Sequence, residues 1–139
     1  MTANTTPIFE LKPLPVGAQT GGPNALQFTS ADTTAKKTLC TGATDGTRID
    51  QIQCCSNDTA AINLAFYMSD GTTDFYLGNV NIPAGSGYTT VAAIDAISSL
   101  NPILGYLWVP GSATIKCACV ATMTSAKALD VRAHGGVFS

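Results

Sequence analysis

The stretch that decides the fold class is RIDQIQCCSNDTAAINLAFYMSDGTTDFYLGNVNIPAGSG, residues 48–87. Its middle part alternates between two faces with the period of two that belongs to a β-strand, because successive side chains of a strand point in opposite directions. One face carries four apolar side chains: Ile62, Leu64, Phe66 and Met68. Asp70-Gly71 then signals a turn, so residues 74–82 are expected to return as the next strand. The pattern predicts that the four apolar side chains face the core of a sandwich.

Similar short strands are predicted over the rest of residues 25–139, separated by turn signals rich in Gly, Pro, Asn and Asp. The predicted strands are residues 25–29, 35–40, 48–55, 61–68, 74–82, 89–94, 104–109, 114–122 and 128–133. Only residues 95–100 fit a short helix, which Asn101-Pro102 would end. Short strands without a βαβ pattern predict an all-β fold, namely an antiparallel β-sandwich or jelly roll of about eight strands.

Residues 1–24 differ from this domain because four prolines and three glycines interrupt them. Such spacing forbids a helix and discourages a central strand. We therefore predict an extended N-terminal arm (1–24) before a β-sandwich domain (25–139). Apolar side chains are spaced along the arm and are candidates for binding a partner: Ile8, Phe9, Leu11, Leu14 and Val16. The alternative is that the arm folds back over the edge of its own sheet.

The C-terminal end offers one more candidate for partner binding, Phe138, which follows Gly135-Gly136 and Val137. Two placements are open for this ring. It either packs on its own core or anchors in the groove of a neighbouring molecule.

Charged residues make up only 12% of the chain, about half of the usual share. A free monomer normally keeps its surface charged, so this scarcity favours a surface that partners cover, although a Thr-rich extracellular β-domain has similar chemistry. Seven basic residues and a net charge of −2 argue against a nucleic-acid partner. No apolar run approaches the length of a membrane span. The N-terminus lacks the pattern of a signal peptide, so we expect synthesis in the cytoplasm.

No pattern predicts an enzyme, a metal site or a cofactor. The five cysteines are expected to be reduced and mostly buried. Cys117 and Cys119 share a strand face, but the spacing is not that of a zinc site, and His134 is the only histidine. Cys54 and Cys55 point to opposite faces of their strand. Six aromatic residues keep a sugar-binding face open as an alternative: Tyr67, Phe75, Tyr76, Tyr88, Tyr106 and Trp108.

Residues 45–138 resemble a family of small phage structural proteins, the cement or decoration proteins of tailed-bacteriophage heads. The resemblance lies in the quoted stretch, preceded by Thr47, and in the closing pattern of a Pro-Gly turn, an alanine-rich strand and VRAHGGVF. It is similar to the jelly-roll type found in podovirus-like phages. The resemblance implies a homodimer on the outer surface of the capsid that bridges subunits of the major capsid protein.

Two hypotheses follow. The first is a structural virion protein that staples neighbouring major capsid protein subunits and stabilises the shell. The alternative is a β-sandwich module of a virion fibre or tail that binds a receptor or a carbohydrate.

Overall fold

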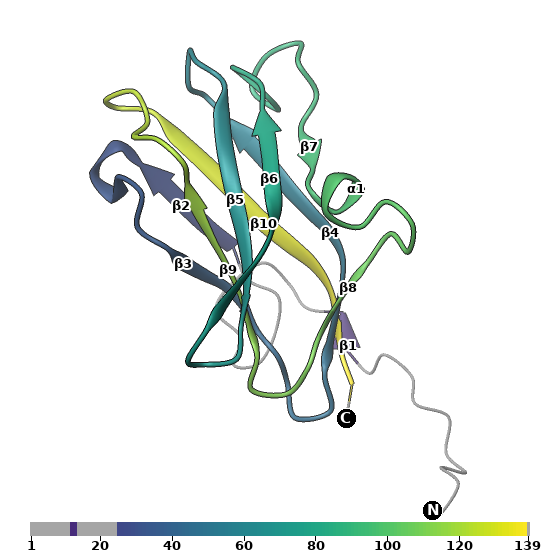
Figure 1. Ribbon diagram of the computed structural model, residues 1–139. Helices are drawn as coiled ribbons and strands as arrows, with labels where there is room; N and C mark the ends of the chain where they lie inside the picture. Colours follow the sequence, from purple (N-terminus) through teal and green to yellow (C-terminus); the bar gives the residue numbers. More distant parts are fainter. Residues whose placement is uncertain (1–11, 14–24, 139) are drawn as a thin grey trace, which may run out of the picture.

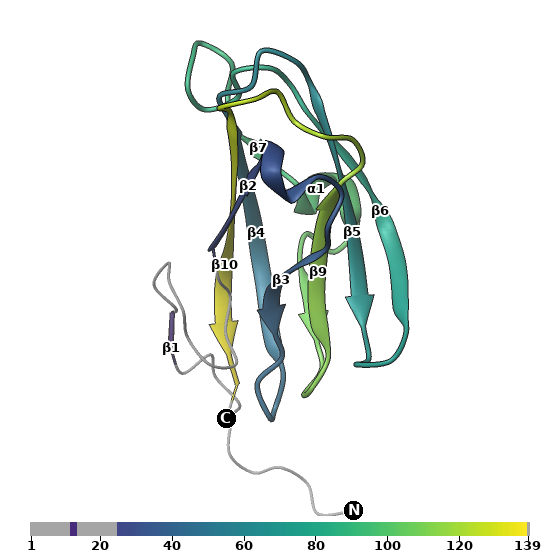
Figure 2. The same cartoon turned by 90° about the vertical axis from the view of Figure 1, so that its left-hand side faces the viewer.

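The computed structural model describes residues 12–13 and 25–138. Two antiparallel sheets face one another, as the view in Figure 2 shows. The first sheet contains β1 (Lys12–Pro13), β2 (Ala25–Thr29), β4 (Thr47–Ser56), β7 (Ile94–Asp95), β8 (Leu107–Val109) and β10 (Ala128–Val137). The second contains β3 (Lys37–Thr41), β5 (Ile62–Ser69), β6 (Asp74–Ile82) and β9 (Thr114–Cys119). The predicted antiparallel β-sandwich is confirmed.

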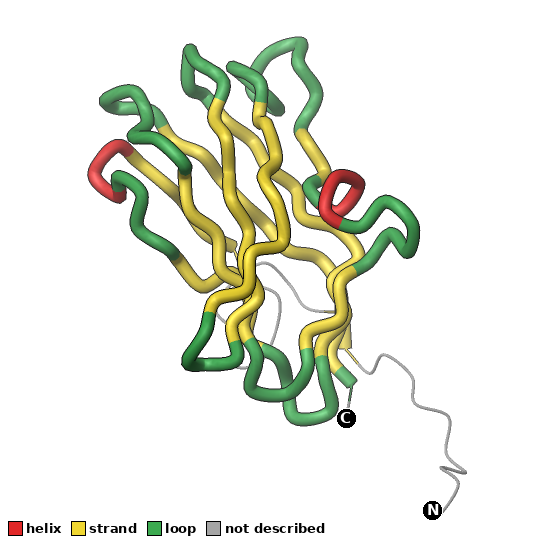
Figure 3. The backbone as a smooth tube through the Cα atoms, in the orientation of Figure 1, coloured by secondary structure: helices red, strands yellow, loops and turns green. Residues whose placement is uncertain are grey.

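The chain changes sheet at most of its connections. In the first sheet β10 pairs with β2 on one side and with β4 on the other, and β4 also pairs with β8 and β7. In the second sheet the order is β3-β9-β5-β6. Of the longer strands, only β5 and β6 follow one another within one sheet, as the hairpin that Asp70-Gly71 predicts. Two short helical turns, η1 (Ser30–Asp32) and α1 (Ile97–Leu100), lie in the connections; Figure 3 shows the loops gathered at the two ends of the sandwich.

The core lies between the sheets and is formed by the side chains that alternate inward. On β5, Ile62, Leu64 and Phe66 are buried as predicted, while Met68 is only half-buried near the strand end. On β10, Leu129, Val131 and Ala133 are buried. The largest fully buried side chains include Phe28, Phe66, Leu39, Ile49, Ile52, Leu64, Ile82, Ile97, Ile115 and Leu129. Period-two patterning therefore selects most of the inward side chains of β5 and β10, although the small residue Ala65 on the other face of β5 is also buried.

Three predicted strands are much shorter in the structure, and one of them is 104–109, of which only Leu107–Val109 form β8. Residues 89–94 do not form one strand: only Ile94–Asp95 pairs, with Cys54 and Gln53 of β4. The preceding residues belong to turns in which Gly85 and Gly87 have positive φ and Thr89 donates its N–H to Gly85. The prediction was wrong there because the backbone groups of Thr89 and Val91 form hydrogen bonds within the turn, with Gly85 and Gly87, rather than with a neighbouring strand.

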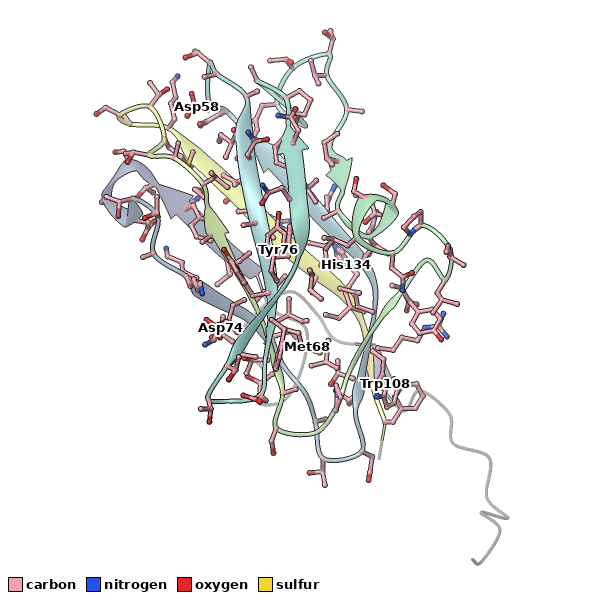
Figure 4. All side chains as sticks on the ribbon, viewed as in Figure 1. Asp58, Met68, Asp74, Tyr76, Trp108 and His134 are labelled. Atoms are coloured by element: carbon pink, nitrogen blue, oxygen red, sulfur yellow. The ribbon has the colours of Figure 1, made fainter. Side chains whose placement is uncertain are left out.

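β9 likewise ends at Cys119 rather than at residue 122, where the chain enters a loop clamped by Asp58. The Asp58 carboxylate is 2% exposed and accepts hydrogen bonds from Thr124 N at 2.9 Å, Thr124 Oγ1 at 2.6 Å and Ala60 N at 3.0 Å. Burial opposes its ionisation, but the hydrogen bonds from Thr124 and Ala60 outweigh burial and keep the pKa of Asp58 below its usual value. Figure 4 shows Asp58 at one end of the sandwich, where it joins two loops.

The predicted arm has one described segment, β1. Lys12 pairs with Val137 and Pro13 with Gly136, both on β10 of the same chain. This is a sheet edge, where a proline is tolerated because its missing N–H removes no central ladder bond. For these two residues the fold-back alternative therefore holds. The remaining arm residues, including Ile8, Phe9, Leu11, Leu14 and Val16, lie outside the described residues.

Candidate interaction surfaces

The most exposed large apolar side chains belong to the loop between α1 and β8. Ile103 is 92% exposed and Leu104 60% exposed. A loop tip of this kind normally carries polar side chains, because exposed aliphatic groups gain nothing from contact with water. Two adjacent exposed aliphatic residues therefore make this loop a candidate for binding a partner.

Asn101 holds this loop in one conformation. Its N–H donates to Ile97 O at 2.8 Å, and its carbonyl accepts from Gly105 N at 2.9 Å. Its side-chain Nδ2 donates to Tyr106 O at 2.9 Å, while Oδ1 accepts from Leu104 N at 3.4 Å. The apolar tip is thus presented by a hydrogen-bonded turn, which lowers the conformational entropy lost on binding.

The adjacent edge of the first sheet is aromatic. Trp108 of β8 is 44% exposed, and its ring lies 5.2 Å from the ring of Phe138, centroid to centroid. A Cβ on Gly46, whose φ is +99°, would come within 2.2 Å of the Trp108 ring, so only glycine allows this close stacking. Phe138 N also donates to Gly46 O at 3.1 Å. Phe138 therefore packs on its own domain, beside Trp108, which Figure 4 shows at the lower edge.

We call Ile103, Leu104, Trp108 and Phe138 the β8 edge patch. Its only nearby cation, among the described residues, is engaged: the Arg48 guanidinium lies 4.6 Å from the centre of the Tyr106 ring and binds Asp50 at 2.6 Å. The patch is thus apolar and uncharged, which suits it to another apolar surface.

The outer face of the second sheet has a different character. Tyr67 and Tyr76 meet edge to face, with ring centres 5.7 Å apart, and Lys36 Nζ lies 4.1 Å from the centre of the Tyr67 ring. Asp74 accepts from Lys36 at 2.8 Å and from Lys116 at 3.0 Å. These two ammonium groups keep the pKa of Asp74 far below its usual range. Figure 4 shows Asp74 and Tyr76 on this face.

A pocket of about 310 Å³ opens beside this face, at the end of the sandwich that holds the turn after β5. Its lining includes Met68, Phe75, Pro110 and Ala113. Phe75 is itself exposed. The polar side chains in its lining are Ser69, Asp70 and Ser112.

The outer face of the first sheet carries a third surface around Tyr88. The Tyr88 hydroxyl donates to Asp130 Oδ2 at 2.6 Å, and Gln27 Nε2 donates to Asp130 Oδ1 at 2.9 Å. A pocket of about 150 Å³ lies here and is lined by Gln53, Cys55, Gly87, Tyr88, Asp130 and Arg132.

The cysteines differ in burial as their positions in the strands predict. All five are free thiols; Cys40, Cys54, Cys117 and Cys119 are buried, and only Cys55 is half-buried. Burial raises the pKa of the Cys40 and Cys54 thiols to about 12 and that of Cys119 to about 11. In the part of the chain that the structure describes, no group of three His, Cys, Asp or Glu residues is placed to hold a metal ion. No helix within those residues is long and apolar enough to cross a membrane.

Sequence reasoning missed Ile103 and Leu104. Residues 104–109 were predicted as a strand, but β8 begins only at Leu107. The sequence did contain a signal for this surface. Two large aliphatic residues lie between Pro102 and Gly105, and turns flanked by such residues usually carry polar side chains. The six aromatic candidates for a sugar-binding face are all at least partly exposed, and none lies in the core.

The sequence was also compared with known proteins. No protein-family model matches it, and no curated protein is similar enough to identify a relative.

Proposed function

We propose that this protein is a structural component of a tailed-bacteriophage head that binds the outer capsid surface and staples neighbouring major capsid protein subunits. The observation that carries the proposal is the exposed pair Ile103 and Leu104, which a turn hydrogen-bonded by Asn101 presents in the loop that leads into β8, the strand of Trp108. A protein with so few charges and an apolar patch held ready for contact is suited to binding another protein surface. The resemblance of residues 45–138 to cement proteins supplies the identity of that partner.

The strand order supports the jelly-roll part of this proposal. The four main strands of the first sheet follow the order β2-β10-β4-β8, and those of the second follow β3-β9-β5-β6. Two sheets of four strands joined mainly by crossings between them are expected for a double Greek key. In this proposal the protein is made in the host cytoplasm and reaches the virion by assembly.

Shell stabilisation follows from binding alone. A protein that binds the assembled shell more tightly than its separated subunits shifts the equilibrium towards the shell. Repeated over a lattice, and with a homodimer contacting two subunits at once, modest single contacts give strong attachment. The alternative role in receptor or carbohydrate recognition would use a different surface, the outer face of the first sheet around Tyr88.

The test measures the temperature at which heads release their DNA. Heads that lack the protein should release DNA at a lower temperature than complete heads, and adding the purified protein should restore the difference. The Ile103→Ser/Leu104→Ser double variant should bind such heads weakly and restore little. The matched control is Val91→Ser/Val120→Ser, which removes two exposed aliphatic side chains elsewhere. Equal release temperatures with and without the protein would refute the proposal.

A further inference from the structure

Tyr88 is an exposed aromatic ring with a hollow on each side. It is 54% exposed and lines two separate pockets, of about 150 and 320 Å³. The smaller lies over β4 and β10; the larger is lined in part by Asn57, Thr59 and Thr89. Tyr88 thus borders both hollows, and its exposed ring offers an apolar face to a ligand.

The ring is held in place rather than free to rotate. Its hydroxyl donates to Asp130 Oδ2 at 2.6 Å, and its backbone N–H donates to Gly85 O at 3.1 Å. Gly87, at φ +75°, lies so close to Cys55 that a Cβ would come within 2.6 Å of the sulfur. The segment before Tyr88 is therefore pressed onto β4, and the ring needs little reorganisation to accept a ligand.

Groups of opposite charge line the smaller pocket but form no salt bridge with one another. Asp130 and Arg132 lie two residues apart on β10, so their side chains share the outer face. Arg132 pairs across the strands with Gln53, is exposed, and forms no salt bridge with any described residue. Asp130 already accepts from Tyr88 and Gln27 and keeps further acceptor capacity. The site thus offers a planar donor fork, a carboxylate acceptor and an amide beside an aromatic face.

We propose that this site binds one pyranose unit of a saccharide. A pyranose presents an apolar face of C–H groups, which suits an aromatic ring, and an equator of hydroxyl groups that both donate and accept hydrogen bonds. Paired hydroxyls, or the carboxylate of a uronic acid, fit the two parallel N–H groups of an arginine. The second hollow beyond Tyr88 leaves room for the next unit of the chain. The larger apolar patch at β8 lacks such polar groups and is not part of this site.

The test is a titration of the ¹⁵N-labelled full chain with D-glucose and, separately, with D-glucuronate, followed by amide chemical shifts. Saturable shifts are expected at Gln53, Gly87, Tyr88, Asp130 and Arg132. Tyr88→Ala should weaken binding about tenfold or more. The matched control is Tyr76→Ala, which removes a similarly exposed ring (59%) from the other sheet and should leave binding unchanged.

The two sugars separate the two possible contacts of Arg132. Binding of glucose and glucuronate alike, retained in Arg132→Gln, assigns recognition to hydroxyl groups. Binding of glucuronate alone, lost in Arg132→Gln, assigns it to the carboxylate. No saturable shift with either sugar, or equal loss of binding in Tyr76→Ala, would overturn the proposal. Because Tyr88 is exposed, the dispersed spectrum of each variant shows directly whether it is folded.

Discussion

Phe66 and Ile103 are both large apolar residues, but their exposure to solvent is opposite. Phe66 points between the sheets and is fully buried, whereas Ile103 stands at a loop tip with 92% of its surface exposed. Phe66 shares the inner face of its strand with Ile62 and Leu64, while Ile103 sits beside Leu104 in a turn held by Asn101. The difference teaches that apolar residues in register with a strand stabilise this fold, and that contiguous ones in a turn are available for a partner.

The strongest way to test this contrast is to truncate the interior ring. Phe66→Ala should lower the free energy of unfolding by about 3–5 kcal/mol, because it removes buried contacts and leaves a cavity. Denaturant unfolding of the purified protein measures the change. A loss below about 1 kcal/mol would show that the space between the sheets is not tightly packed.

The next largest effect is expected at Asp58, which joins two loops. Asp58→Ala should cost about 2 kcal/mol at pH 7, because three donors at Ala60 and Thr124 lose their charged acceptor.

The Asp58 contribution also has a predictable pH dependence. The folded pKa is lowered, so its contribution is fully present above the ordinary carboxylate pKa near 4 and is lost as pH falls through the folded value. The wild-type and Asp58→Ala unfolding curves should therefore converge below about pH 4. A difference that persists unchanged at pH 2 would contradict this linkage.

Cys54 and Cys55 are adjacent in the sequence but differ in the same way, since Cys54 is buried and Cys55 is only half-buried. Cys54→Ser should cost about 1–3 kcal/mol, since it places a hydroxyl among buried apolar groups, while Cys55→Ser should change stability by less than about 0.5 kcal/mol. A thiol reagent at pH 8 should modify Cys55 first in the folded protein. Rapid reaction of several thiols without denaturant would show that the interior opens readily.

The smallest effect on stability is expected at the exposed loop. Ile103→Ser should change the free energy of unfolding by less than about 0.5 kcal/mol, because the side chain is already in water. Its attachment to heads should nevertheless weaken. A loss of stability comparable with that of Phe66→Ala would mean that Ile103 is buried in the folded protein in solution.

Sequence patterning predicted the bounds of some strands well, even of edge strands that have a partner on one side only. The bounds predicted for 25–29 and 74–82 coincide with β2 and β6. The predicted helix at 95–100 contains α1. Residues 89–94 are rich in β-branched residues, but they follow the turns that bring Gly87 against Cys55, and only their last residue pairs. Local pattern fails there because strand formation depends on a free neighbouring edge, which lies far away in the chain.

The candidate surfaces were less predictable than the fold. Phe138 was identified, but its contact with Trp108 over Gly46 joins residues from three distant parts of the chain. Tyr88 appeared only as one aromatic among six, and nothing near it in sequence indicates that Asp130 would hold its hydroxyl. Such contacts follow from strand pairing, which the linear pattern does not encode.

The sequence by itself determined the all-β class, the inward face of each main strand and the position of the β5–β6 turn, because these depend on period-two alternation and local turn chemistry. Only the tertiary structure decided which apolar residues remain exposed, which sheet edge carries Trp108 and Phe138, and which polar groups surround Tyr88. Those properties depend on which strands lie side by side, and that is set by the packing of the whole domain.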